Sequence, residues 1–196
     1  MTGRRIADLF ERLGRLVTAT KQKAGEGSSW SYTFPDGETH RYVIRGLKSH
    51  AEAEDSAFNL IIWIWNAKDH LIQRANTRGQ DSRLVEDAVN ADSALPVCAD
   101  LANRLKHGQL RWSRSGRYPS FGVMSFTGHQ ASIGSLTFRA FEVEVQIADP
   151  SLVEFSLPVI GQDGAEIGDA FELAGRAVSA LEAIKARIEK GGLTCA

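Results

Sequence analysis

Apolar side chains recur at helical spacing near the start of the chain and again near its end. Residues 4–22 place them every three or four positions with Arg and Glu between them, and residues 167–189 repeat this arrangement. Such a period predicts an amphipathic helix in each segment. The run "AGEGSS" ends the first helix because glycine and serine disfavour its continuation.

The segment after this break alternates between aromatic and polar residues. Trp30, Tyr32 and Phe34 occupy every second position, a Pro-Asp-Gly turn follows at 35–37, and alternation resumes through Tyr42 and Ile44. Alternation on both sides of a tight turn predicts a short β-hairpin.

A long and unusually apolar helix is predicted over about 49–74, with "AFNLIIWIW" at its centre. At about 100° per residue its polar positions fall on one narrow stripe. That stripe comprises Glu52, Asp55, Asn59, Asn66, Asp69, His70 and Gln73. A short helix over 82–90 and another ending near 106 follow, the latter capped by Asp92 or Ser93 and carrying Pro96 in its first turn.

The later part of the chain alternates as β-strands over 122–128, 132–148 and 151–160. The whole pattern predicts a mainly α (α+β) protein of one domain, 1–196. Its helical core covers about 4–24, 49–107 and 167–189, and a small antiparallel sheet or hairpin forms a β-rich insertion at about 119–160. The C-terminal helix closes the fold.

Composition limits the classes of function. The net charge of −1 gives no overall attraction to nucleic acid or anionic membrane, so any such contact needs a local patch. Two cysteines, Cys98 and Cys195, form neither a disulfide framework nor a zinc-site spacing. We expect no signal peptide and no membrane span, because the longest apolar run, Leu60–Trp65, is too short. A cytoplasmic protein without metal or cofactor is therefore predicted.

Candidate chemistry gathers on the helix that ends near 106. Its apolar stripe contains Ala94, Cys98, Leu101, Ala102 and Leu105, whereas Asp100, Asn103, Arg104 and His107 lie on the opposite side with Lys106 at the flank. One interpretation is a solvated face with an Asp–Arg pair and a Lys-His end that suits the helix dipole. The other is a site for acid–base or phosphate chemistry, which uses these residue types.

The long apolar helix supports the second interpretation. Asn66, Asp69 and His70 interrupt a helix too apolar to be exposed, so they must be hydrogen-bonded, reach water or contact a partner. A buried Asp69–His70 pair that fixes helix packing remains the alternative to a catalytic role.

The runs "WNAKDH" (Trp65–His70) and "ADLANRLKH" (Ala99–His107) resemble a group of uncharacterised bacterial proteins of similar length. That group is similar to the HEPN superfamily of all-helical bundles, and the resemblance covers about residues 50–112. It implies a homodimer and a bacterial defence or stress context. Many active HEPN members are metal-independent ribonucleases.

The chain departs from the usual HEPN active-site motif. Arg104 and His107 are separated by fewer residues than in active members, and Asn103 precedes the arginine. The departure favours a HEPN-like, non-catalytic binding or regulatory protein of unknown ligand.

The alternative is an endoribonuclease. It would use His107 as general acid or base and Lys106 or Arg104 to stabilise phosphorane charge. Asn103 and Asp100 would orient the reacting groups, and Asp69 is a further catalytic candidate.

The next segment, "RWSRSGRY", offers candidate RNA contacts. Arg111, Trp112 and Arg114 combine cations with a stacking ring, together with Asn66, His70, Asp100 and Arg104 as further binding candidates. A plain surface turn between helix and sheet is the alternative.

Overall fold

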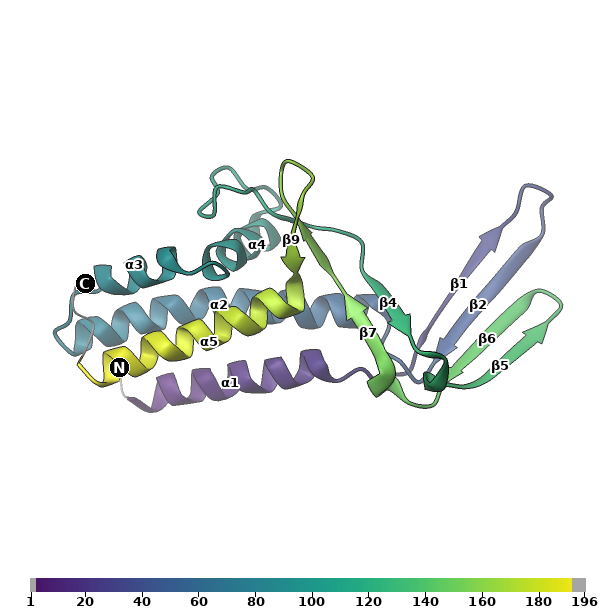
Figure 1. Cartoon of the computed structure of the whole chain (residues 1–196), viewed down its shortest axis with the longest axis horizontal. Coiled ribbons are helices and arrows are strands. Elements are labelled where there is room, and N and C mark those ends of the chain that lie inside the picture. Colours follow the sequence, from purple (N-terminus) through teal and green to yellow (C-terminus); the bar gives the residue numbers. More distant parts are fainter. Residues whose placement is uncertain (1–2, 192–196) are drawn as a thin grey trace. The chain divides into compact units, whose positions relative to one another are not determined.

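The computed structural model describes residues 3–191, so Cys195 lies outside the described part. Within this range five α-helices and nine β-strands make an α+β fold whose last element is a long helix (Figure 1). The helices are α1 (Gly3–Lys21), α2 (His50–Thr77), α3 (Arg83–Ala91), α4 (Leu95–His107) and α5 (Ala170–Glu189). All five predicted helices are confirmed. None of the helices in the described range is long and apolar enough to cross a membrane.

Contacts divide the chain into two compact units. The helical unit comprises the residues up to Thr20, Ser56–Val123 and the residues from Leu157 onward. The sheet unit comprises Lys21–Asp55 and Met124–Ser156. The single domain predicted from the sequence stays a prediction, because this division does not decide whether the units fold independently.

The helical unit is built around apolar faces that the sequence period identified. Leu13 of α1, Ile61 and Leu71 of α2, and Leu181 of α5 are fully buried. Cations lie over rings between helices, with Arg12 of α1 4.3 Å from the Trp63 ring centroid in α2. Asp169 begins α5 because its carboxylate accepts the backbone N–H groups of residues 171 and 172.

The strands differ in detail from the predicted ones. The run 132–148 is a hairpin of β5 (Ile133–Arg139) and β6 (Glu142–Ile147), with a turn at residues 140–141. The run 151–160 is divided between β7 (Val153–Ser156) and β8 (Pro158–Ile160), which belong to different sheets. Alternation alone does not reveal where a strand changes its partner.

Two small antiparallel sheets account for most of the remaining strands. In the helical unit β3 (Ser120–Phe121) pairs with β8, which pairs with β9 (Glu166–Asp169). In the sheet unit β4 (Ser125–Gly128) pairs with β7. The strand β9 replaces the first turn of the helix predicted to begin at 167.

The largest sheet contains four strands in the order β1-β2-β6-β5. The hairpin predicted from the aromatic alternation is confirmed as β1 (Ser28–Thr33) and β2 (Thr39–Arg45). Its second strand pairs in parallel with β6, so Arg41 lies opposite Glu142. Two hairpins distant in sequence therefore form one sheet, whereas the sequence predicted separate β elements.

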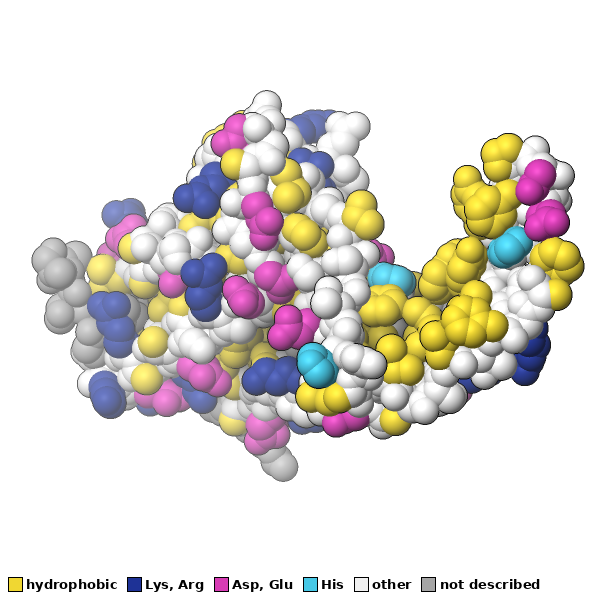
Figure 2. Space-filling model, turned by 45° about the vertical axis from the view of Figure 1, so that its right-hand side comes forward, with side chains coloured by type: hydrophobic (Ala, Val, Ile, Leu, Met, Phe, Trp, Pro, Cys, Tyr) yellow, Lys and Arg dark blue, Asp and Glu magenta, His cyan; other side chains and the backbone are white. Residues whose placement is uncertain are grey.

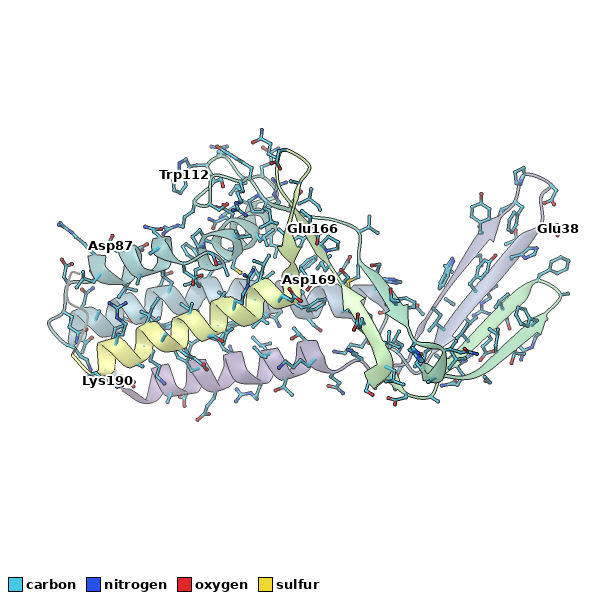
Figure 3. The ribbon with its side chains drawn as sticks, viewed as in Figure 1. Glu38, Asp87, Trp112, Glu166, Asp169 and Lys190 are labelled. Carbon is cyan, nitrogen blue, oxygen red and sulfur yellow. The ribbon has the colours of Figure 1, made fainter. Side chains whose placement is uncertain are left out.

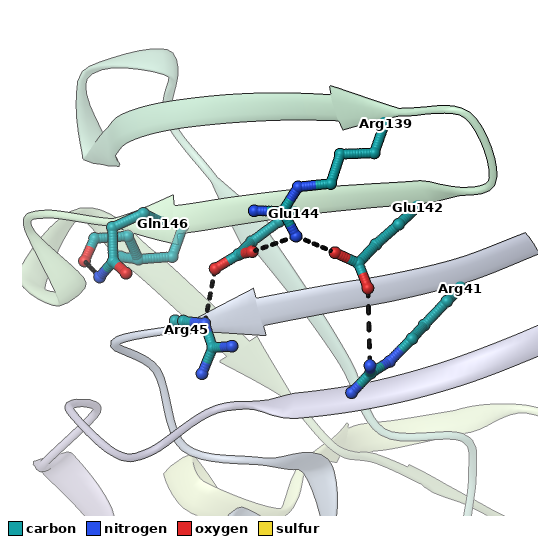
Figure 4. Close-up of polar contacts among 7 residues, drawn as sticks. Arg41, Arg45, Arg139, Glu142, Glu144 and Gln146 are labelled. Carbon is teal, nitrogen blue, oxygen red and sulfur yellow. Dashed lines mark hydrogen bonds and ion pairs between the residues drawn. The ribbon is translucent and has the colours of Figure 1, made fainter.

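The two faces of this sheet carry opposite chemistry. Register places the apolar side chains on one face, here called the aromatic face: Trp30, Tyr32, His40, Tyr42, Ile44, Leu136, Phe138, Val143 and Val145. The other face, the polar face, carries an ion-pair network (Figure 4). Its members are Arg41–Glu142 at 3.5 Å, Arg45–Glu144 at 2.6 Å and Arg139–Glu142 at 2.6 Å.

Candidate functional site

Helix α4 begins and ends at clear local signals. Of the two predicted capping residues, Asp92 accepts the backbone N–H groups of residues 94 and 95, each at 2.8 Å. It thus caps the turn that leads into α4, and Ala94 is the residue that immediately precedes the helix. Gly108 adopts φ +72° and donates its N–H to the Arg104 carbonyl at 2.8 Å. Because glycine adopts this left-handed conformation without steric cost, the helix stops immediately after His107.

The interpretation of the polar stripe of α4 as a solvated face is wrong at Asp100. Every residue from Ala94 to Ala102 is buried, and Asp100 is only 1% exposed. The helical wheel placed Asp100 away from the core-forming leucines, but the loop after α4 folds over that side. The predicted Asp100–Arg104 pair is also not among the ion pairs of the described residues.

Asp100 holds the loop that follows α4. Its Oδ2 accepts the hydroxyl of Ser113 at 2.6 Å and both the hydroxyl and the N–H of Ser115 at 2.7 and 2.9 Å. Its Oδ1 accepts the N–H of Arg114 at 2.7 Å. Four donors meet the needs of a buried carboxylate, so Asp100 fixes the loop and is not available to orient a substrate.

The loop conformation depends further on Ser113. The Ser113 hydroxyl accepts the backbone N–H of Tyr118 at 3.1 Å, and Tyr118 has φ +50°. A positive φ is uncommon for a residue with a side chain, so the surrounding contacts must determine it. The loop after α4, for which a plain surface turn was the alternative prediction, therefore has a conformation fixed by the contacts of Asp100 and Ser113.

Arg114, a predicted ligand-binding residue, is also part of a structural network. Its guanidinium donates to Glu86 of α3 and to Asn90, each at 2.8 Å. Glu86 also accepts the ammonium of the buried Lys68 of α2 at 2.8 Å. Both cations lie over the Trp65 ring, at 4.5 Å for Lys68 and 4.9 Å for Arg114.

This network lowers the pKa of Glu86. Burial opposes ionisation of the carboxyl group, but hydrogen bonds and charge from Lys68 and Arg114 outweigh it, so the pKa lies below its ordinary value. Neither Lys68 nor Glu86 was predicted from the sequence as part of the site. A lysine within an apolar helix was the available signal, because such a residue needs a partner when it is buried.

On α2, the predicted buried Asp69–His70 pair is wrong. The Asp69 side chain is 70% exposed and contacts its neighbour Lys68 at 3.1 Å, while His70 is half-buried. Asn66 behaves as expected for a polar group that links helices, because its Oδ1 accepts the Lys106 ammonium of α4 at 3.0 Å. The two predicted stripes thus meet at one hydrogen bond.

The remaining candidates lie at the end of α4 and in the following loop. Asn103 and Arg104 are half-buried, and Arg104 Nε is buried with no partner among the described residues. Lys106, His107 and Arg111 are exposed. Trp112 is 68% exposed and lies at the edge of the loop (Figure 3).

Other catalytic groups find no support in the described part of the chain. Burial raises the pKa of the Cys98 thiol to about 12, with a smaller effect from Asp92, so this cysteine is not a nucleophile at neutral pH. Residues 3–191 contain no cluster of side chains suited to a metal ion. A pocket of about 580 Å³ beside Arg117 also contains Asp163 and Glu166, which disfavour an anionic ligand.

Comparison with protein-family models, curated proteins and solved structures finds no match for this chain. The HEPN-like resemblance and everything it implies therefore stay predictions.

Proposed function

We propose that this protein is a non-catalytic binding protein whose ligand is a polyanion such as single-stranded RNA. The observation that carries the proposal is the exposed Trp112 on a loop that Asp100 holds in place. A large ring held in water by a fixed loop is suited to stacking on a base, and functional contacts are common on such loops. The HEPN-like and defence-related aspects of this proposal rest on the resemblance alone.

The charge of the surrounding segment supports an anionic ligand. No acidic residue occurs between Asp100 and Glu142. Lys106 directly precedes His107 and Arg111 directly precedes Trp112, and both cations are exposed. Cations beside a stacking ring are the combination that single-stranded nucleic acid contacts use.

A binding role fits these residues better than a catalytic role. General acid–base catalysis by His107 requires a neighbouring group that orients its ring. The predicted orienting residue Asp100 is fully used by the loop, and Asp69 contacts Lys68. The His107 side chain has no hydrogen bond or ion pair among the described residues.

RNA binding can be measured with a labelled single-stranded oligouridine by fluorescence anisotropy. We expect Trp112→Ala to raise Kd about tenfold, because base stacking on an aromatic side chain contributes about 1–3 kcal/mol. Arg111→Ala should lower the slope of log K against log salt concentration by about 1, because one phosphate contact is lost. Arg83→Ala, at an exposed arginine of α3, is the matched control and should change neither quantity. Absence of binding at low salt would contradict the proposal.

One observation favours the endoribonuclease as a second candidate. The Lys106 ammonium is held by Asn66, so a fixed cation directly precedes the exposed His107 in the chain. Incubation with total RNA separates the two functions. Under the binding proposal the wild type leaves RNA intact, whereas cleavage that disappears in both His107→Ala and Asp69→Ala would establish the enzyme.

A further inference from the structure

The aromatic face of the four-stranded sheet brings several exposed apolar side chains together in one patch. Trp30 is 47% exposed, Tyr32 54%, Leu136 48% and Phe138 70%. Phe141, in the turn between β5 and β6, is 54% exposed and adjoins the face through its ring contact with His40. Figure 2 shows hydrophobic side chains gathered along one side of this sheet.

The rings on this face are already arranged in contact with one another. Trp30 stacks on Tyr42 with ring centroids 5.6 Å apart, and Tyr32 meets Phe34 edge-on at 4.8 Å. Phe34 and His40 continue the series at 4.8 Å. Such contacts restrict the rotamers of the side chains, so little conformational entropy remains to be lost when a partner covers them.

The lack of charged residues on the aromatic face indicates which kind of partner can cover it. Its strand positions contain no Lys, Arg, Asp or Glu, because the charged residues of these strands lie on the polar face and are paired there. RNA would need cations beside the rings, and the face offers none. The turn between β1 and β2 carries Asp36 and Glu38 and no cation, which also disfavours an anionic membrane. A protein surface that is itself apolar fits this face.

The exposed area matches a dimer. At about 150–250 Å² for each ring, the exposed fractions correspond to an apolar patch on the order of 600 Å². A patch of this size is at the upper end of what monomers expose, and such patches are often functional. Two copies would bury about 1,200 Å², at the lower end of the range for a stable interface.

We propose that two copies of this chain dimerise by packing their aromatic faces against each other, with Phe138, Trp30 and Tyr32 as the central contacts. A two-fold axis places the same uncharged patch on both sides, so no like charges oppose each other. The two sheets would then form a sandwich about 10 Å thick, the usual spacing of packed sheets. RNA binding by the loop after α4 is not required for this inference.

Sedimentation velocity of the full chain over a range of concentrations tests the proposal. The wild type should sediment as a species with twice the 21.4 kDa mass of one chain. High salt should not dissociate this dimer, because the interface is apolar. Phe138→Asp should raise the dimer Kd about 30-fold or more, since it truncates a central ring and buries a charge. Ser135→Asp adds the same charge to β5 on the polar face and should leave the dimer intact.

A milder variant and a second measurement cover the case in which Phe138→Asp does not fold. Phe138→Ser, whose fold is checked by circular dichroism, should give a smaller increase in Kd. Dilution of the wild type below Kd should accelerate hydrogen exchange in β1 and β5. A wild type that is monomeric at all concentrations would overturn the proposal, and the patch would then be covered within the chain or by another protein. Equal dissociation by Ser135→Asp would overturn it as well.

Discussion

Replacement of Asp100 by alanine is expected to lower the free energy of unfolding by about 3–4 kcal/mol. The change leaves four donors of the loop without an acceptor, and each unsatisfied buried group costs about 1–3 kcal/mol before the loop relaxes. Relaxation into water recovers part of this sum, because the two serines follow an exposed segment. The measurement is urea denaturation followed by circular dichroism, with linear extrapolation to water.

Two further variants make this prediction specific. Asp87→Ala removes an exposed carboxylate on α3 (Figure 3) and should change stability by less than about 0.5 kcal/mol. Asp100→Asn keeps the shape of the side chain but loses its charge. Its decrease in the free energy of unfolding should therefore lie between those of Asp87→Ala and Asp100→Ala. The loop in Asp100→Ala should also be cut faster by protease at residues 108–118. Full stability of Asp100→Ala would mean that the loop is not held by this carboxylate.

Replacement of Glu86 by glutamine is expected to lower the free energy of unfolding by about 2–3 kcal/mol at neutral pH. The neutral amide leaves the buried Lys68 ammonium and the Arg114 guanidinium without a shared counter-charge. Breaking one side of a buried ion pair costs about 3–5 kcal/mol, and partial exposure of Glu86 reduces this figure. Asp69→Asn is the matched control, because the exposed Asp69 also contacts Lys68 and its loss should be nearly neutral.

The difference between wild type and Glu86→Gln should depend on pH. The folded-state pKa of Glu86 is lowered, so its contribution is fully present above the ordinary glutamate pKa of 4.5 and is lost as the pH falls from there through the folded-state value. Denaturation at pH 7, 5, 4 and 3 should therefore show the two stabilities converging in acid. A difference that stays constant over this range would exclude the proposed ionic role.

The helices could be predicted from the sequence because each one carries its own period and its own end signals. Gly108 and the Asp92 cap, for example, define α4 without any tertiary information. The alternation of the strands could also be predicted from the sequence, but the parallel pairing of β2 with β6 could not. A strand's period reports which side is apolar and says nothing about which distant strand lies beside it.

The candidate site could be predicted only in part, for a related reason. The wheel of α4 placed Lys106 and His107 at the end of the helix, where both are exposed, but it did not predict the hydrogen bond from Lys106 to Asn66. It failed for Asp100 and Arg114, because the partners of both come from the loop 108–119 and from α3. Whether a polar side chain faces water depends on what folds over it, and a helical period does not contain that information.

The parallel pairing of β2 with β6 has a consequence for the order of events during synthesis. Arg41 and Glu142 are 101 positions apart, so the hairpin β1–β2 leaves the ribosome long before the strand that completes its sheet. At about 5–20 residues per second the aromatic hairpin stays without its neighbour for roughly 5–20 s, and an isolated hairpin is only marginally stable in water. Closing a loop of this length also makes the pairing entropically late. The nascent chain thus exposes the aromatic side chains of β1 and β2 for several seconds. We expect this hairpin to be the segment that a holdase chaperone would bind.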